Sequence, residues 1–131
     1  MTRWPIGLLI VAMVACVPTA STSPAVPGTI EIEVVAGPVC PVEREPPDPA
    51  CDPGPVDGAR ILIQPGDGRD IVVGEATSDA SGRATVEIAP GDYIVLGIDV
   101  EGLMGRPEPA TVTVSPGQAV MVTLTYDTGI R

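Results

Sequence analysis

The chain has 131 residues and a formal net charge of −10, from 17 acidic against seven basic residues. All seven basic residues are arginine, and the sequence contains no His, Lys, Asn or Phe. The length leaves room for one domain, and the charge disfavours binding to nucleic acid. Without histidine there can be no Ser-His or Cys-His nucleophile pair and no ordinary catalytic zinc site. We therefore expect a single domain that is not an enzyme and that has no metal and no cofactor.

Residues 1–15 are typical of a signal peptide, with a short positive start and an apolar run that is too short to span a bilayer. Residues 13–16, Met-Val-Ala-Cys, resemble the lipobox of bacterial lipoproteins, with Met where most have Leu. The resemblance implies acylation of Cys16, which would place the protein on the outer face of the cell membrane through a lipid anchor alone. Cleavage by an ordinary signal peptidase after Ala15 or Ala20, giving a secreted protein, remains open.

Residues 16–28 are rich in Thr, Ser, Ala and Pro, a composition typical of a flexible tether. The folded domain is then residues 29–131. Within it, short runs rich in Val, Ile and Thr alternate with Pro- and Gly-containing turns, a pattern that predicts an all-β sandwich of two sheets. The predicted strands are residues 29–35, 59–64, 71–77, 83–89, 93–99, 110–114 and 119–126. The last two are expected to form a hairpin around residues 115–118.

A proline-rich insert at residues 37–58 separates the first two predicted strands. It contains Cys40 and Cys51, which are free to pair if Cys16 is acylated, and a disulfide is the usual fate of such residues outside the cytoplasm. Two cysteines without a histidine would make a poor zinc site. Four prolines lie between the cysteines, so we expect no regular element there. The residues of this loop that we single out for interaction are Val42, Glu43, Arg44, Glu45 and Asp48.

Residues 77–83, Thr-Ser-Asp-Ala-Ser-Gly-Arg, followed by residues 89–93, Ala-Pro-Gly-Asp-Tyr, resemble the signature of carboxypeptidase regulatory-like domains. The likeness covers about residues 29–126, and the insert and the C-terminal end are similar to those of small exported bacterial proteins with this domain. It implies a seven-stranded antiparallel Greek-key sandwich of the prealbumin (transthyretin) type. In such a sandwich Asp79 and Gly82 would shape a hairpin, and Tyr93 would enter the core. Ala84 stands where the family has an aromatic residue.

Two kinds of chemistry remain possible for so acidic a chain: paired carboxylates that catalyse glycoside hydrolysis, and calcium binding near Asp67 and Asp70. We expect neither, because the acids fall in turns or at outward strand positions such as Glu31. The family resemblance also suggests a carbohydrate-binding accessory module, which would stack sugars on exposed aromatic rings. Tyr93 and Tyr126 are both expected to point inward, which disfavours that alternative.

One feature exceeds what a simple sandwich requires. If Tyr93 faces the core, an apolar patch of four residues faces the other way. The residues of this patch are Leu62, Ile94, Leu96 and Ile98. We expect the insert, with Val39 and Val42, to cover the patch; the alternative is a docking surface for a partner or a second copy. The prediction is a non-catalytic envelope domain with an interaction or structural role, whose partner is an unknown protein or envelope polymer.

Overall fold

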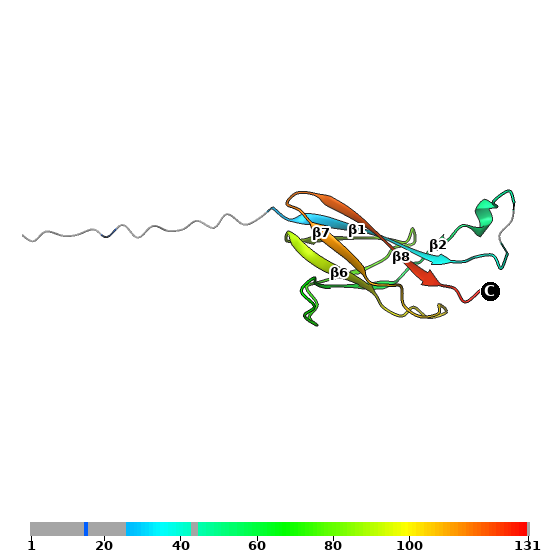
Figure 1. The fold of residues 1–131 in the computed structure, drawn as a ribbon. Coiled ribbons are helices and arrows are strands. Elements are labelled where there is room, and N and C mark those ends of the chain that lie inside the picture. Colours follow the sequence, from blue (N-terminus) through cyan, green and yellow to red (C-terminus); the bar gives the residue numbers. More distant parts are fainter. Residues whose placement is uncertain (1–14, 16–25, 43–44, 131) are drawn as a thin grey trace, which may run out of the picture.

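A computed structural model describes residues 15, 26–42 and 45–130 (Figure 1). The elements are β1 (Gly28–Gly37), the 3-10 turn η1 (Pro49–Cys51), β2 (Gly54–Pro55), β3 (Arg60–Pro65), β4 (Gly74–Thr77), β5 (Arg83–Ile88), β6 (Gly91–Gly97), β7 (Ala110–Val114) and β8 (Ala119–Asp127). The all-β prediction is confirmed, and a strand overlaps each of the seven predicted segments. The additional strand, β2, is short and lies in the insert. No helix in the described part of the chain is long and apolar enough to span a membrane.

The strands form two four-stranded sheets. In the first sheet β1 pairs with β2, β5 and β8, and the second sheet has the order β4-β3-β6-β7. Two expected hairpins are absent, because β4 and β5 lie in different sheets and so do β7 and β8. The all-antiparallel expectation is also wrong at one place, because β1 and β8 run parallel over nine residue pairs.

The turn between β7 and β8 explains the parallel pairing. The backbone N–H of Thr29 donates to the carbonyl of Gln118 (2.8 Å), and the N–H of Gly117 donates to the carbonyl of Pro27 (3.3 Å). The turn is therefore held by the beginning of β1. The chain leaves it beside β1 and in the same direction, so that β8 joins the first sheet instead of folding back along β7.

The core lies between the two sheets and follows the alternation of the sequence. In β1, Ile30, Ile32 and Val34 are buried, whereas Glu31 is exposed on the outer face. The other buried apolar residues are Val56, Ala59, Ile61, Ile63, Ala84, Val86, Ile88, Val95, Val112, Val114, Val122, Leu124 and Tyr126. Burial of β-branched side chains on alternate positions of both sheets is the main source of stability for such a sandwich.

The strand predicted at residues 71–77 begins only at Gly74. Ile63 of β3 pairs with Gly74, and continuing this register would place Val72 opposite Pro65, which has no N–H to donate. Ile71, Val72 and Val73 therefore precede the strand, and they are 46%, 51% and 45% exposed.

The connection between β4 and β5 makes two contacts, of which the first fastens the end of the insert and the second holds β1. Ser78, only 3% exposed, accepts a hydrogen bond from the N–H of Ala59 (2.9 Å) and donates one to the carbonyl of Val56 (2.6 Å). Gly82 has a positive φ of 72°, and its carbonyl accepts from the N–H of Val34 (2.6 Å). The connection between β4 and β5 thus holds both β1 and the segment that leads into β3.

Candidate functional site

The insert is closed by a disulfide between Cys40 and Cys51, as predicted, with the two Cα atoms 5.2 Å apart. The expectation that the insert contains no regular element is wrong, because the insert contains the short 3-10 turn η1. Asp48 caps this turn by accepting a hydrogen bond from the N–H of Ala50 (2.9 Å), and Pro49 begins it. Proline suits the first position of a helical turn because its φ is already fixed and its missing N–H would have no partner there.

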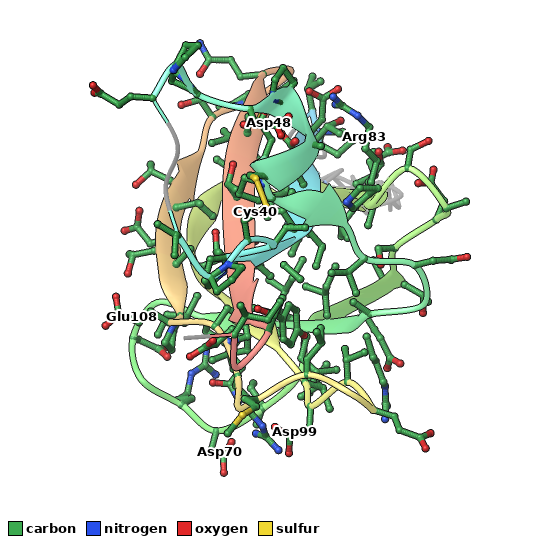
Figure 2. All side chains as sticks on the ribbon, turned by 90° about the vertical axis from the view of Figure 1, so that its right-hand side faces the viewer. Cys40, Asp48, Asp70, Arg83, Asp99 and Glu108 are labelled. Atoms are coloured by element: carbon green, nitrogen blue, oxygen red, sulfur yellow. A yellow bond between two sulfur atoms is a disulfide. The ribbon has the colours of Figure 1, made fainter. Side chains whose placement is uncertain are left out.

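The Cys40–Cys51 loop extends the first sheet beyond the end of β1 (Figure 1). Val35 and Ala36 of β1 pair with Pro55 and Gly54 of β2. After β8, Thr128 donates hydrogen bonds from its backbone N–H to the carbonyl of Gly37 and from its hydroxyl to the carbonyl of Pro38. Figure 2 looks at this end of the molecule and shows Cys40 and Asp48 on one side. Asp70 and Asp99 lie on the other side, and each follows a strand of the second sheet.

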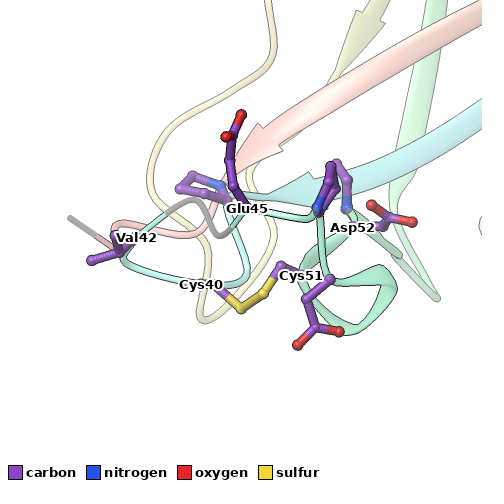
Figure 3. Close-up of a pocket in the computed structure, with 9 residues that line it drawn as sticks. Cys40, Val42, Glu45, Cys51 and Asp52 are labelled. Carbon is purple, nitrogen blue, oxygen red and sulfur yellow. A yellow bond between two sulfur atoms is a disulfide. The ribbon is translucent and has the colours of Figure 1, made fainter.

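The loop borders an open pocket of about 470 Å³ (Figure 3). Its lining is Pro38, Cys40, Val42, Glu45, Pro47, Asp48, Cys51, Asp52 and Pro53. Three of the predicted loop residues, Val42, Glu45 and Asp48, therefore lie at the pocket, and Val42 is 70% exposed. Glu43, Arg44 and the predicted lipidation site Cys16 lie outside the described residues.

The pocket combines proline rings and a disulfide with three carboxylates. Asp52 was not singled out from the sequence, and only its position directly after Cys51 could have indicated it. Within the described residues, no three potential metal ligands lie close enough to hold a metal ion. The arrangement can therefore offer an acidic, proline-lined surface to a basic group, but it lacks the convergence that metal binding requires.

Several acids outside the loop interact with arginine or with polar side chains. Asp67 pairs with Arg69 (2.6 Å), and hydrogen bonds from the backbone N–H and guanidinium of Arg69 lower the pKa of Asp67. Asp70 accepts a hydrogen bond from the amide of Gln64 (3.1 Å). Asp67 and Asp70, considered above for calcium, thus have protein partners. A lowered pKa also makes a carboxylate a poor general acid near neutrality.

The two tyrosines of the described part both donate a hydrogen bond from the hydroxyl group to a backbone carbonyl. Tyr126 is fully buried and donates to the carbonyl of Ile98 (2.5 Å), and its burial raises the pKa of the phenol. Tyr93 packs against the core and donates to the carbonyl of Ala89 (2.5 Å). Among the described residues, one aromatic ring is therefore fully buried and the other is partly buried against the core, which gives a sugar little ring surface to stack on.

The apolar patch of Leu62, Ile94, Leu96 and Ile98 lies on the outer face of the second sheet. All four residues are partly exposed, and Leu62 pairs with Leu96 in the register of β3 and β6. The expectation that the insert covers this patch is wrong, because the insert is tied to β1 and β8 of the first sheet. The large exposure of Val42 agrees with this placement.

No protein-family model matches the chain, and a search of the curated proteins finds no match. Among solved structures, the chain is similar to the minor pilin GBS52 of Streptococcus agalactiae (TM-score 0.59, 17% identity, 79% of this chain and 45% of that one). A variant of BcpA, the major pilin subunit of Bacillus cereus, matches with a TM-score of 0.56 and 19% identity over 77% of this chain and 30% of that one.

A DUF3823 family protein from Parabacteroides merdae matches with a TM-score of 0.50 and 14% identity, over 78% of this chain and 46% of that one. The likeness is one of fold. The chain spans less than half the length of each of these three structures, and the shared part is a β-sandwich consistent with the prealbumin type.

Proposed function

We propose that this protein is a non-catalytic domain of the bacterial cell envelope that belongs with the carboxypeptidase regulatory-like domains. In this proposal a lipid on Cys16 anchors it to the outer face of the membrane, and the Cys40–Cys51 loop contacts a partner. The observation that carries the proposal is the position of this loop at the end of the sandwich opposite to the point where the chain enters it (Figure 1).

The distance between these two ends follows from one strand. The chain enters the sandwich at Gly28, and β1 runs for ten residues before it leads into the loop after Gly37. At about 3.3 Å per residue, β1 spans roughly 30 Å. A domain tethered through residues 16–28 would therefore hold the loop at its far tip, away from the membrane.

The chemistry of the loop indicates the kind of partner. Glu45, Asp48 and Asp52 surround the pocket, and Val42 extends an apolar side chain into solvent. Carboxylates beside prolines and an exposed valine suit a protein segment or envelope polymer that carries basic groups. Two further facts support a role without catalysis: the sandwich fold is shared with pilin domains, and the acids paired with arginine are exposed.

Intact mass measurement of the protein purified from the membranes of the producing cells tests the anchor. The expected mass is that of residues 16–131 plus acyl chains and minus two hydrogen atoms for the disulfide. A Cys16→Ser variant, which should stay unprocessed or be released without lipid, is the control. An unacylated wild-type chain would contradict the anchor.

Co-sedimentation of the mature protein with isolated envelopes of the producing cells tests the loop. We expect the double variant Glu45→Gln and Asp52→Asn to lose most of its binding, because both carboxylates line the pocket. Replacing the exposed acids Glu101 and Glu108 by glutamine makes the same change in charge elsewhere and should have little effect. Equal binding by both double variants would contradict the role of the loop.

A further inference from the structure

The strand β8 forms a long open edge of the first sheet. Its only strand partner among the described residues is β1, which pairs with one side of it. The edge strands β4, β5 and β7 have four, six and five residues, whereas β8 has nine. Proteins usually protect such an edge with charged residues, proline or a bulge, because its free N–H and C=O groups can pair with another chain.

Hydrogen bonds at the two ends of β8 show which of its backbone groups face β1. At the start of the strand, the N–H of Thr29 in β1 donates to the carbonyl of Gln118 (2.8 Å). At the other end, the N–H of Thr128 donates to the carbonyl of Gly37 (3.2 Å). The direction of these groups alternates along a strand, so the even-numbered residues of β8 face β1 and the odd-numbered residues face away from it.

Four residues of β8 are left with free backbone groups. The carbonyl of Asp127, the last odd-numbered residue, accepts from the N–H of Met104 (2.7 Å). Before Asp127, no backbone hydrogen bond within residues 26–42 and 45–130 reaches this side of the strand. The residues that direct their N–H and C=O groups there are Ala119, Met121, Thr123 and Thr125. Donors and acceptors at this spacing match the backbone of another extended polypeptide.

The edge is uncharged in a strongly acidic chain. Residues 109–126, which include β7, the following turn and most of β8, contain none of the 17 acidic and seven basic residues. On the outer face, the acids beside this stretch are Glu31 and Glu33 of β1 and, at the end of β8, Asp127. Arg83 is the neighbour of Glu33 on the far side of β1, and neither glutamate forms an ion pair within the described residues.

These two glutamates favour basic side chains on the outer face of an added strand. Such a strand would lie about 10 Å from β1, which is two strand spacings. A lysine or arginine side chain pointing towards Glu31 or Glu33 can span this distance together with the glutamate side chain. The charges beside the edge therefore suit a basic partner and disfavour an acidic one.

The inner side of the edge is apolar. Val122 and Leu124 are 6% and 1% exposed, and they face the space between the two sheets. Val112 and Val114 of β7, which contacts β8 from the second sheet, are also buried. A strand added to β8 would direct every second side chain towards this space and the others to the outer face. The edge thus suits a segment in which apolar residues alternate with basic ones.

We propose that β8 binds an extended segment of a partner polypeptide, which joins the first sheet as a further strand with apolar side chains towards the core and basic side chains on the outer face. A second copy of this chain is disfavoured, because each copy carries a net charge of −10 and two paired β8 edges would bring Glu31 and Glu33 of both copies to one face. The edge is separate from the Cys40–Cys51 loop, and the proposal needs neither the loop nor the anchor.

Calorimetric titration with a synthetic peptide tests the edge. The protein is the mature chain with Cys16→Ser, which has no lipid and no free thiol, and the probe is a peptide of about eight alternating valines and lysines with blocked ends. Two further peptides carry N-methyl groups on all valine amides or on all lysine amides. In a strand the valine N–H groups point to one edge and the lysine N–H groups to the other. We expect one methylated peptide to keep its affinity and the other to bind at least tenfold more weakly.

Variants of the protein locate the binding. Thr123→Pro removes an N–H that faces away from β1, so the pairing with β1 should persist while the unmethylated peptide binds at least tenfold more weakly. Replacing Glu31 and Glu33 by glutamine should weaken binding severalfold, whereas the same change at the exposed residues Glu101 and Glu108 should have little effect. Equal binding of the two methylated peptides, equal loss in the two glutamine variants, or no binding below about 1 mM overturns the proposal.

Amide hydrogen exchange of the isotope-labelled parent, observed by NMR, tests the edge if Thr123→Pro folds poorly. In the dilute free protein, the amides of Met121, Thr123 and Thr125 should exchange much faster than those of Val122 and Leu124, which face β1. Saturating peptide should slow the first three at least tenfold. Slow exchange of these three without peptide would show that the chain covers the edge itself, and slowing that grows with protein concentration alone would show a second copy there. Either result overturns the proposal.

Discussion

Replacing Ser78 with alanine should destabilise the whole sandwich, although it removes a single oxygen atom. That oxygen accepts from the N–H of Ala59 and donates to the carbonyl of Val56, and these two residues are 0% and 7% exposed. A buried polar group that loses its partner costs about 1–3 kcal/mol, so the loss of both bonds should lower the free energy of unfolding by about 2–4 kcal/mol. For a domain of this size each kcal/mol lowers Tm by about 4–8 °C.

Urea denaturation followed by far-UV circular dichroism measures this change. Ser81→Ala is the matched control, because Ser81 lies in the same connection, is exposed, and uses only its backbone N–H, which donates to Asp79 (2.9 Å). We expect this control to stay within about 0.5 kcal/mol of the parent. If Ser78→Ala also stays within that range, the hydroxyl does not hold the insert to the sandwich and the reasoning fails.

Three further predictions concern the fastening of the loop and the core. Replacing Cys40 and Cys51 by serine should lower the free energy of unfolding by up to roughly 3 kcal/mol, from the entropy of the opened loop, while the sandwich still folds; urea denaturation with and without reductant measures this. Gly82→Ala should cost more than about 1 kcal/mol, because φ is +72° and a Cβ atom there would overlap the carbonyl oxygen of Val34, and the loss should appear in Tm. Burial raises the pKa of Tyr126, so the folded state favours the neutral phenol. The stability that this preference contributes is complete below the ordinary pKa of 10.0 and is lost as pH rises through the higher pKa of the folded state. Tyr126→Phe should remove this dependence of stability on pH.

Each of these has a control or an outcome that would contradict it. Gly102→Ala is matched to Gly82→Ala, because Gly102 also has a positive φ (86°) but has no neighbouring atom within 4 Å of the added Cβ. Equal losses at both glycines would show that the contact with Val34 contributes nothing. A double serine variant that fails to fold would show that the loop is part of the core structure. Unchanged stability of the parent above pH 10.0 would contradict the burial argument for Tyr126.

Local patterns in the sequence were sufficient for most of the strands and for the disulfide. The alternation of Ile30, Ile32 and Val34 with glutamates marks a half-buried strand because successive side chains of a strand point to opposite faces. Counting cysteines paired Cys40 with Cys51, because only two remain once Cys16 has another role. Both inferences use information that lies within a few residues, or in a simple count.

The candidate site was predicted less completely. The sequence indicated the loop and its acids, but it placed the loop over the apolar patch of the second sheet, whereas β2 and Thr128 tie it to the first sheet. Ser78 gave no signal either, because a serine in a turn is usually exposed, and its two partners lie 19 and 22 residues away along the chain. A contact at such separations has no periodic pattern that a sequence could display.

The sequence by itself determined that the chain forms short strands with one apolar side, a closed acidic loop and no histidine-based chemistry, because each follows from residue type and local spacing. Only the tertiary structure decided which strands are neighbours. The pairing of β8 with β1 depends on the turn at residues 115–118 being held by Thr29, a contact across most of the chain. The pairing of β8 with β1 places the last strand in the first sheet, and Thr128 at its end holds the loop there, away from the apolar face of the second sheet.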